Sequence, residues 1–250
     1  MLIENPKGNY RFLKGISPYS AGAAAMPGYE IERARLNPPL PLNQGFAAIE
    51  RHLKAVGRAR HALCAMELRS PRPFSFQGFS EFNAGYVGIL KSWDLFVDGL
   101  NPVARTNVAL EIAGPPEPSV FGFSYTVPIR GSGATFVIAG AGELPEGSLD
   151  PHDVVRRGET SEAAMREKAQ FVMGLMEGRL HGLGADWASV TATDIYTVHD
   201  IHPFLAGIVL DKMRPAASQG VTWNYARPPI VSIEYEMDMR GCRREIVLSS

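Results

Sequence analysis

Apolar and polar positions follow the period of a helix in several stretches of the chain. Residues 45–59 place apolar side chains three or four positions apart, with polar side chains between them, which predicts an amphipathic helix. Residues 82–97 show the same spacing, and residues 161–184 extend it into a long helix capped by Thr160 or Ser161. A short helix is predicted over residues 202–213, with Pro203 in its first turn.

Short apolar runs between these helices predict strands. Residues 61–70 form such a run, which ends at Pro71 and Pro73. By the same reasoning, further strands are predicted over residues 106–113, 120–129, 134–144, 187–198, 228–239 and 243–248. The last two are predicted to pair with each other around a turn at Gly241.

The order of helices and strands in the first half of the chain recurs in the second half. This recurrence predicts an α+β fold of two tandem units, residues 1–128 and 129–250, with a boundary marked by Pro128, Gly131 and Gly133. Each unit is expected to be a mixed sheet with two helices on one face. The other sheet face is then expected to bury itself against a second sheet, in the same chain or in another copy.

Composition narrows the class of protein. With 250 residues, 45% of them hydrophobic and 20% charged, the chain can bury a large core. Its 25 Lys and Arg residues are balanced by 26 Asp and Glu residues, so nucleic acid is not an expected partner. The apolar runs are too short to span a membrane, and the N-terminus lacks an apolar signal region. Only two cysteines occur, which is typical of a cytoplasmic protein.

Motifs for metal or nucleotide chemistry are weak. His199 and His202 lie three positions apart, but they fall where a predicted strand ends and Pro203 begins a helix, so no metal site is expected. The glycine-rich residues 131–142 match neither a dinucleotide-binding nor a phosphate-binding loop. No cofactor is expected either.

Several motifs together resemble the RidA/YjgF family of enamine and imine deaminases. In the first half, residues 17–23 (SPYSAGA) resemble the Pro-Tyr-Ser segment of that family, residues 82–86 (FNAGY) its Asn-bearing helix, and residues 101–110 (NPVARTNVAL) its Pro-x-Arg strand entrance. In the second half, residues 136–145, 182–204 and 225–236 resemble further segments of the family. The resemblance covers roughly residues 10–250.

This resemblance implies two RidA-like domains of the chorismate-mutase-like fold, assembled as a homo-trimer. It also implies hydrolytic deamination, without a cofactor, of a small enamine or imine carboxylic acid such as 2-aminoacrylate or a 2-aminomuconate-like acid. Arg105 would bind the carboxylate of this metabolite, because the planar guanidinium makes paired hydrogen bonds to a carboxylate. Glu245 would activate water, with Glu143 a weaker candidate. Substrate-binding roles are expected for Tyr19, Asn83, Asn107 and Arg227.

Neither half carries the complete site of that family, which leaves alternatives open. The strand at 120–129 has no carboxylate, and in the second half Ala139 and Ala141 replace the usual Ser and Gln. A site shared between the two halves would reconcile these departures. From the residues alone, Glu245 beside Arg243 and Arg244 is also typical of an exposed strand with paired charges. The other functions considered are a chorismatase-like hydrolase and a non-catalytic, regulatory protein that binds a carboxylate metabolite.

Overall fold

The computed structural model describes residues 2–129, 134–148 and 150–249 of the chain. Its described strands form a seven-stranded and a six-stranded sheet, both mixed. The seven-stranded sheet contains, in spatial order, β1 (Leu2–Asn5), β2 (Tyr10–Leu13), β3 (Gly22–Ala25), β8 (Phe136–Gly142), β12 (Glu236–Gly241), β9 (Ala192–Tyr196) and β10 (Thr222–Asn224). The six-stranded sheet contains β11 (Ala226–Arg227), β6 (Ala104–Leu110), β5 (Leu63–Ser70), β7 (Ser119–Pro128), β4 (Tyr29–Pro41) and β13 (Glu245–Ser249).

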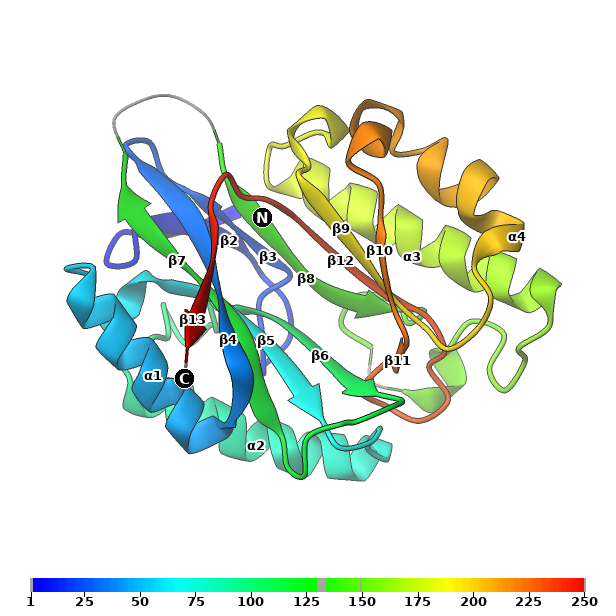
Figure 1. The fold of residues 1–250 in the computed structure, drawn as a ribbon, viewed down its shortest axis with the longest axis horizontal. Coiled ribbons are helices and arrows are strands. Elements are labelled where there is room, and N and C mark those ends of the chain that lie inside the picture. Colours follow the sequence, from blue (N-terminus) through cyan, green and yellow to red (C-terminus); the bar gives the residue numbers. More distant parts are fainter. Residues whose placement is uncertain (1, 130–133, 149, 250) are drawn as a thin grey trace.

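Helices cover the outer face of each sheet. The helices α1 (Leu42–Ala55) and α2 (Phe76–Ser92) pack on the six-stranded sheet. The helix α3 (Glu162–Gly182) packs on the seven-stranded sheet, together with α4 (His202–Phe204) and the helical turns that follow it. The result is a helix–sheet–sheet–helix arrangement (Figure 1). The predicted α+β class, with helices on one face of each sheet, is therefore confirmed.

The two sheets bury their inner faces against each other within one chain, as the sequence predicted. A core of small and aromatic residues there draws on β2, β3 and β8 of one sheet and on β4, β5 and β6 of the other. Polar groups also cross this interface: the Thr106 hydroxyl on β6 donates a hydrogen bond of 2.6 Å to Asp238 on β12. Such a buried polar contact fixes how the sheets sit on each other.

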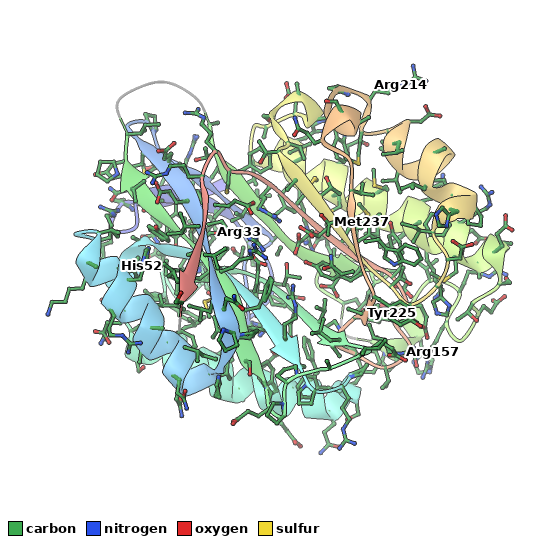
Figure 2. The ribbon with its side chains drawn as sticks, in the orientation of Figure 1. Arg33, His52, Arg157, Arg214, Tyr225 and Met237 are labelled. Atoms are coloured by element: carbon green, nitrogen blue, oxygen red, sulfur yellow. The ribbon has the colours of Figure 1, made fainter. Side chains whose placement is uncertain are left out.

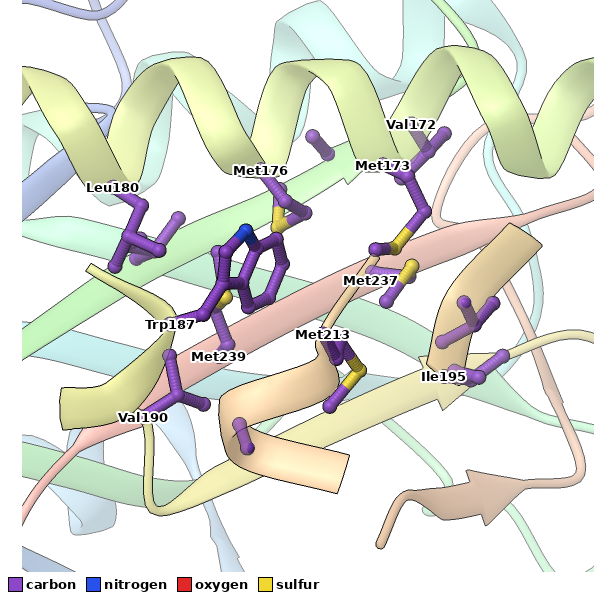
Figure 3. Packing of buried hydrophobic residues seen from close by; sticks show 14 of the residues in the cluster. Val172, Met173, Met176, Leu180, Trp187, Val190, Ile195, Met213, Met237 and Met239 are labelled. Atoms are coloured by element: carbon purple, nitrogen blue, oxygen red, sulfur yellow. The ribbon is translucent and has the colours of Figure 1, made fainter. Parts of the chain in front are cut away.

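The helices form where the periodicity predicted them, with shifted ends. Helix α1 begins at Leu42 and helix α2 at Phe76, each before its predicted start. Helix α3 follows its prediction closely, and its N-cap is Ser161, whose hydroxyl accepts a hydrogen bond from the Ala164 N–H. In the core beneath α3, Met173 and Met176 lie close to β12 (Figure 3). Unbranched Met side chains adapt to the irregular space there.

The predicted hairpin around Gly241 is wrong. The strand predicted over residues 228–239 begins only at Glu236, as β12. Pro228, Pro229 and the positive φ of Ser232 (75°) keep the residues before it out of this strand. β13 does not pair with β12; it runs parallel to β4 in the other sheet, with Glu245 opposite Arg33. The ion pair between these two side chains (2.8 Å) stabilises this register. Figure 2 labels Arg33, which lies on β4 beside β13.

Each sheet takes strands from both halves of the sequence. β1 to β3 join the sheet that holds most of the second half, whereas β11 and β13 join the sheet of the first half. Residues 130–133, which include the predicted boundary glycines Gly131 and Gly133, lie outside the described residues. The division at residue 128 therefore stays a prediction. None of the helices described in residues 2–129, 134–148 and 150–249 has the length and apolar character of a membrane span.

Candidate active site

A cavity of about 70 Å³ lies where β6 of one sheet meets β8 and β12 of the other. The first residues of α2, helix α3 and the segments around residues 15–21, 144–148 and 229–233 complete its walls. Its charged lining consists of Arg105, Glu146, Arg179 and Glu236. A concave site with a few convergent charged groups is the usual form of a small-molecule site.

Arg105 lies buried in a cage of aromatic rings. Its side chain belongs to β6, and the residue is only 3% exposed. Its guanidinium carbon lies 4.8–5.8 Å from the ring centres of Tyr19, Phe79, Phe82 and Tyr86. The last three rings follow one face of α2 at helical spacing, which explains how a single helix supplies most of the cage. The ring faces stabilise the cation but do not supply hydrogen-bond acceptors.

The Arg105 guanidinium has no counter-ion in the described part of the chain. Its Nε and Nη1 atoms are buried and have no hydrogen-bond partner among the described residues. Burial lowers the pKa of Arg105, and nearby Tyr86, Tyr19 and Glu236 oppose this effect. A buried cation without an acceptor is unfavourable unless a ligand supplies one. The arrangement is therefore that of an anion site.

Two asparagines, one on β6 and one on α2, also carry buried hydrogen-bonding groups without a described partner. Asn107 lies two positions along β6 and lines the cavity. Its Oδ1 accepts a hydrogen bond of 2.9 Å from Ser70, whereas its buried Nδ2 has no described partner. Asn83 lies one turn after Phe79 on α2, and its buried Oδ1 likewise has no described partner. Asn107 thus leaves a donor group in the cavity that holds Arg105, whereas Asn83 is not one of its lining residues.

Glu236 is the buried carboxyl of the cavity. The residue is 4% exposed, and its carboxyl group forms no hydrogen bond or ion pair with the residues that the structure describes. Burial and the charge of Asp238 raise the pKa of Glu236 well above its ordinary value of 4.5, while Arg105 and Arg179 pull it down. Arg105 and Glu236 thus influence each other electrostatically across the cavity without forming an ion pair. A carboxyl in this environment can hold a proton at neutral pH.

Arg179 of α3 closes another side of the cavity. Its Nη1 donates to the carbonyl oxygens of Ala139 (2.8 Å) and Gly140 (3.3 Å) on β8. Its Nε and Nη2 donate to the two carboxylate oxygens of Glu146, at 2.5 and 3.1 Å. Arg179 is therefore a guanidinium that is fully oriented by the protein.

The structure brings together only some of the residues that the sequence singled out. Tyr19, Arg105 and Asn107 line the cavity, and Asn83 lies on α2 next to the cage. Arg227 is outside the lining residues and forms a paired contact with Glu111 at 2.6 and 3.1 Å. It therefore lies in a surface ion pair.

The two predicted carboxylates also lie outside the lining residues. Glu245 is on β13, where burial acts to raise its pKa, but ion pairs with Arg240 and Arg33 hold the pKa below its usual value. Glu143 is fully buried against Lys168 and accepts hydrogen bonds from the N–H groups of Glu234 and Tyr235, just before β12. Both carboxylates already have full sets of partners.

Sequence reasoning missed Glu236, Arg179 and Glu146. A signal for Glu236 existed: in residues 234–239, carboxylates alternate with apolar residues at the period of a strand, which puts Glu234, Glu236 and Asp238 on one face. No comparable signal marks Arg179 in the last turn of α3 or Glu146 in the loop after β8. In residues 2–129, 134–148 and 150–249, no group of three or more His, Cys, Asp or Glu residues is placed to hold a metal ion.

Fold and cavity define an α+β protein with a buried anion site between two sheets. Residues 2–246 match the family described as 2-aminomuconate deaminase CnbZ. The chain is 46% identical over 244 residues to a 2-amino-5-chloromuconate deaminase from Comamonas testosteroni, a match that covers 96% of each protein. The chain therefore belongs to the CnbZ family of 2-aminomuconate deaminases.

These matches correct the family expected from the sequence motifs. The assignment to the RidA/YjgF family is wrong, because the family that matches almost the whole chain is CnbZ. Among solved structures, a chorismatase resembles this chain with a TM-score of 0.50 at 10% identity, over 89% of this chain and 77% of the chorismatase. At that identity the similarity concerns the fold alone. The short motifs therefore did not identify the family.

Proposed function

We propose that this protein hydrolyses the enamine of a 2-aminomuconate-type acid, releasing ammonia and leaving the 2-oxo acid. Membership of the CnbZ family supports this reaction class. The observation that carries the proposal is that one cavity holds two buried groups without a partner among the described residues, the Arg105 guanidinium and the Glu236 carboxyl. The first binds a carboxylate, and the second transfers protons.

In this proposal, Arg105 binds the substrate carboxylate adjacent to the amino-bearing carbon. The aromatic cage keeps water away from the guanidinium, so each hydrogen bond to the carboxylate gains strength. The Asn107 Nδ2 group adds a neutral donor on the same side. Tyr19, whose ring packs on Arg105, shapes the pocket. The Asn83 Oδ1, which has no partner among the described residues, offers a hydrogen-bond acceptor on the α2 side.

Glu236 then acts first as an acid and afterwards as a base. As the neutral acid it protonates the enamine carbon, and the C=C–N group becomes a C–C=N iminium. The resulting carboxylate takes a proton from water while the water oxygen bonds to the iminium carbon. A proton passes to nitrogen, the C–N bond breaks, and ammonia leaves as the C=O bond forms. Glu236 loses its proton again when nitrogen is protonated and regains it from the hydroxyl, so no cofactor is needed.

Replacing each of two carboxylates tests this assignment. Glu236→Gln keeps the size of the side chain but cannot deliver and retrieve a proton, so we expect kcat for ammonia release from 2-aminomuconate to fall by about 100-fold or more. Glu245→Gln changes the carboxylate that the sequence had favoured, and we expect kcat to stay within about threefold because Glu245 lies outside the cavity lining. The opposite ranking of the two variants would overturn the role given to Glu236.

Two other functions from the sequence remain as alternatives. A chorismatase-like hydrolysis is favoured by the fold similarity alone. Binding of a carboxylate metabolite without turnover would use Arg105 but not Glu236. Purified protein that releases ammonia from 2-aminomuconate, but leaves chorismate intact, would exclude both. Ligand binding without any turnover would instead support the non-catalytic function.

Assembly and location stay predictions. The homo-trimer and the cytoplasmic location were expected from the sequence-motif resemblance and from the cysteine usage, respectively. Light scattering on the purified protein measures the mass of the assembly directly. A mass of one or two chains would contradict the trimer.

A further inference from the structure

The ion pair between Arg179 and Glu146 stands between the inner cavity and an outer groove. The groove, of about 460 Å³, shares Arg179 and Glu146 with the cavity and runs along α3 past Gly174 and Gly178. Lys14, which has no ion pair in the described part of the chain, lines the groove as well. The positive groups at this end can thus attract a second anionic group, away from Arg105.

The two partners of this ion pair are held very differently. Arg179 is 8% exposed and is fixed from behind by the carbonyl oxygens of Ala139 and Gly140. The Glu146 side chain is 46% exposed and lies in the loop after β8, next to Gly147 with its positive φ of 82°. The guanidinium is therefore the fixed partner, and the carboxylate is the one that can leave.

Glu146 occupies the position that a ligand carboxylate would take. It uses Nε and Nη2, the edge of the guanidinium that makes paired hydrogen bonds to a carboxylate. The opposite side of the guanidinium is bound to β8 and stays oriented when Glu146 moves. An internal carboxylate thus fills a preformed carboxylate site at the mouth of the cavity.

From this arrangement we propose that Arg179 is the subsite for the second carboxylate of a dicarboxylic substrate, and that Glu146 is the counter-ion which this carboxylate displaces. The inference rests on the proposed function and names the substrate end that Arg105 does not bind. With Glu146 displaced and Glu236 protonated, the two guanidiniums balance the two charges of the substrate. A monocarboxylic acid leaves the ion pair intact and gains nothing from Arg179. The subsite therefore selects dicarboxylates.

Binding of two non-reacting acids tests the subsite without requiring turnover. Muconate and sorbate share a six-carbon diene skeleton, but sorbate has one carboxylate instead of two. For Arg179→Lys we expect muconate to bind about tenfold more weakly by calorimetry, because Lys cannot form the paired contact, whereas sorbate affinity changes by less than about twofold. An equal loss for both acids would mean that Arg179 only supports the fold, and the inference would fail.

A second variant keeps the test decisive if Arg179→Lys does not fold. Glu146→Gln removes the charge of the competing group on an exposed loop, so muconate should bind about three- to tenfold more tightly and sorbate should be unaffected. Unchanged or weaker muconate binding by Glu146→Gln would contradict the proposal that a substrate carboxylate displaces Glu146 from Arg179. Glu159→Gln is the matched control, because Glu159 forms a similar paired contact with Arg156 outside the cavity lining.

The two proposals can fail separately. If the wild-type protein releases no ammonia from 2-aminomuconate, but muconate binding depends on Arg179, the deaminase proposal fails and the subsite stands. If the protein deaminates 2-aminomuconate and the preference for muconate over sorbate survives Arg179→Lys, only the subsite fails.

Discussion

The carboxyl group of Glu236 fills the space that a side chain at position 140 would need. A Cβ on Gly140 would collide with Oε1 of Glu236, across the adjacent strands β8 and β12. The absence of a side chain on β8 thus lets a carboxyl lie flat against the backbone and line the cavity. Gly140 is required here for close approach, not for an unusual backbone conformation.

This relationship predicts a variant that changes activity more than stability. In Gly140→Ala the new methyl group displaces the flexible end of Glu236, which can rotate, so the free energy of unfolding should change by less than about 1.5 kcal/mol. The displaced carboxyl no longer reaches the substrate, and kcat for ammonia release should fall by about tenfold or more. Gly88→Ala, with open space around an exposed helical position, is the control. Wild-type kcat in Gly140→Ala would argue against the placement of Glu236 at the reaction centre.

The buried carboxyl of Asp238 predicts how stability depends on pH. Burial, together with the charges of Asp194 and Glu67, raises the pKa of Asp238 to about 7, against the pull of Arg240. The folded protein therefore keeps a proton that the unfolded chain loses near pH 4. The contribution of Asp238 to the free energy of unfolding is fully present below the pKa of the unfolded state. It is lost as the pH rises through about 7.

Asp238→Asn removes this titration and keeps an oxygen to accept the Thr106 hydrogen bond. The wild-type free energy of unfolding, measured with urea, should fall more steeply than that of Asp238→Asn as the pH rises. The difference between the two proteins should shift in favour of Asp238→Asn by at least about 1 kcal/mol from pH 5 to pH 8. Parallel pH profiles for the two proteins would show that Asp238 keeps an ordinary pKa.

Glu143 and Lys168 form a fully buried ion pair at 2.9 Å. Glu143→Gln would leave the Lys168 ammonium without a counter-charge inside the protein, and we expect the free energy of unfolding to fall by roughly 3–5 kcal/mol. Glu111→Gln breaks the half-exposed pair with Arg227, so the expected loss is below about 1 kcal/mol. Urea unfolding of both variants measures the contrast. Equal losses would contradict the structural role of Glu143.

Local periodicity was sufficient for the helices and for several strands. Residues 161–184, for example, carry both a helical stripe and a cap at Ser161, so their structure is set by nearby residues. The pairing of β13 with β4 depends instead on contacts more than 200 positions apart, such as Arg33 with Glu245. A turn at Gly241 looked like a hairpin because sequence spacing does not reveal that the chain crosses to the other sheet there.

The cavity was predicted only in part, because some of its residues lie in local motifs and others meet only through long-range packing. Tyr19, Arg105 and Asn107 lie in motifs that could be recognised one at a time. Glu236 and Arg179 became site residues only through the packing of β12 and α3 around β8. Glu245, by contrast, was expected to be catalytic because the RidA/YjgF family carries a Glu on the corresponding last strand, but Arg33 and Arg240 bind its carboxylate oxygens.

The measurement that tests the central claim most directly is ammonia release from 2-aminomuconate by the wild-type protein and by Arg105→Lys. Lys keeps the positive charge but cannot make paired hydrogen bonds or fill the aromatic cage. We expect wild-type turnover, and a fall in kcat/KM of about 100-fold in Arg105→Lys, equivalent to about 2.7 kcal/mol. A wild-type value of kcat/KM in Arg105→Lys would contradict the claim that this buried guanidinium binds the substrate.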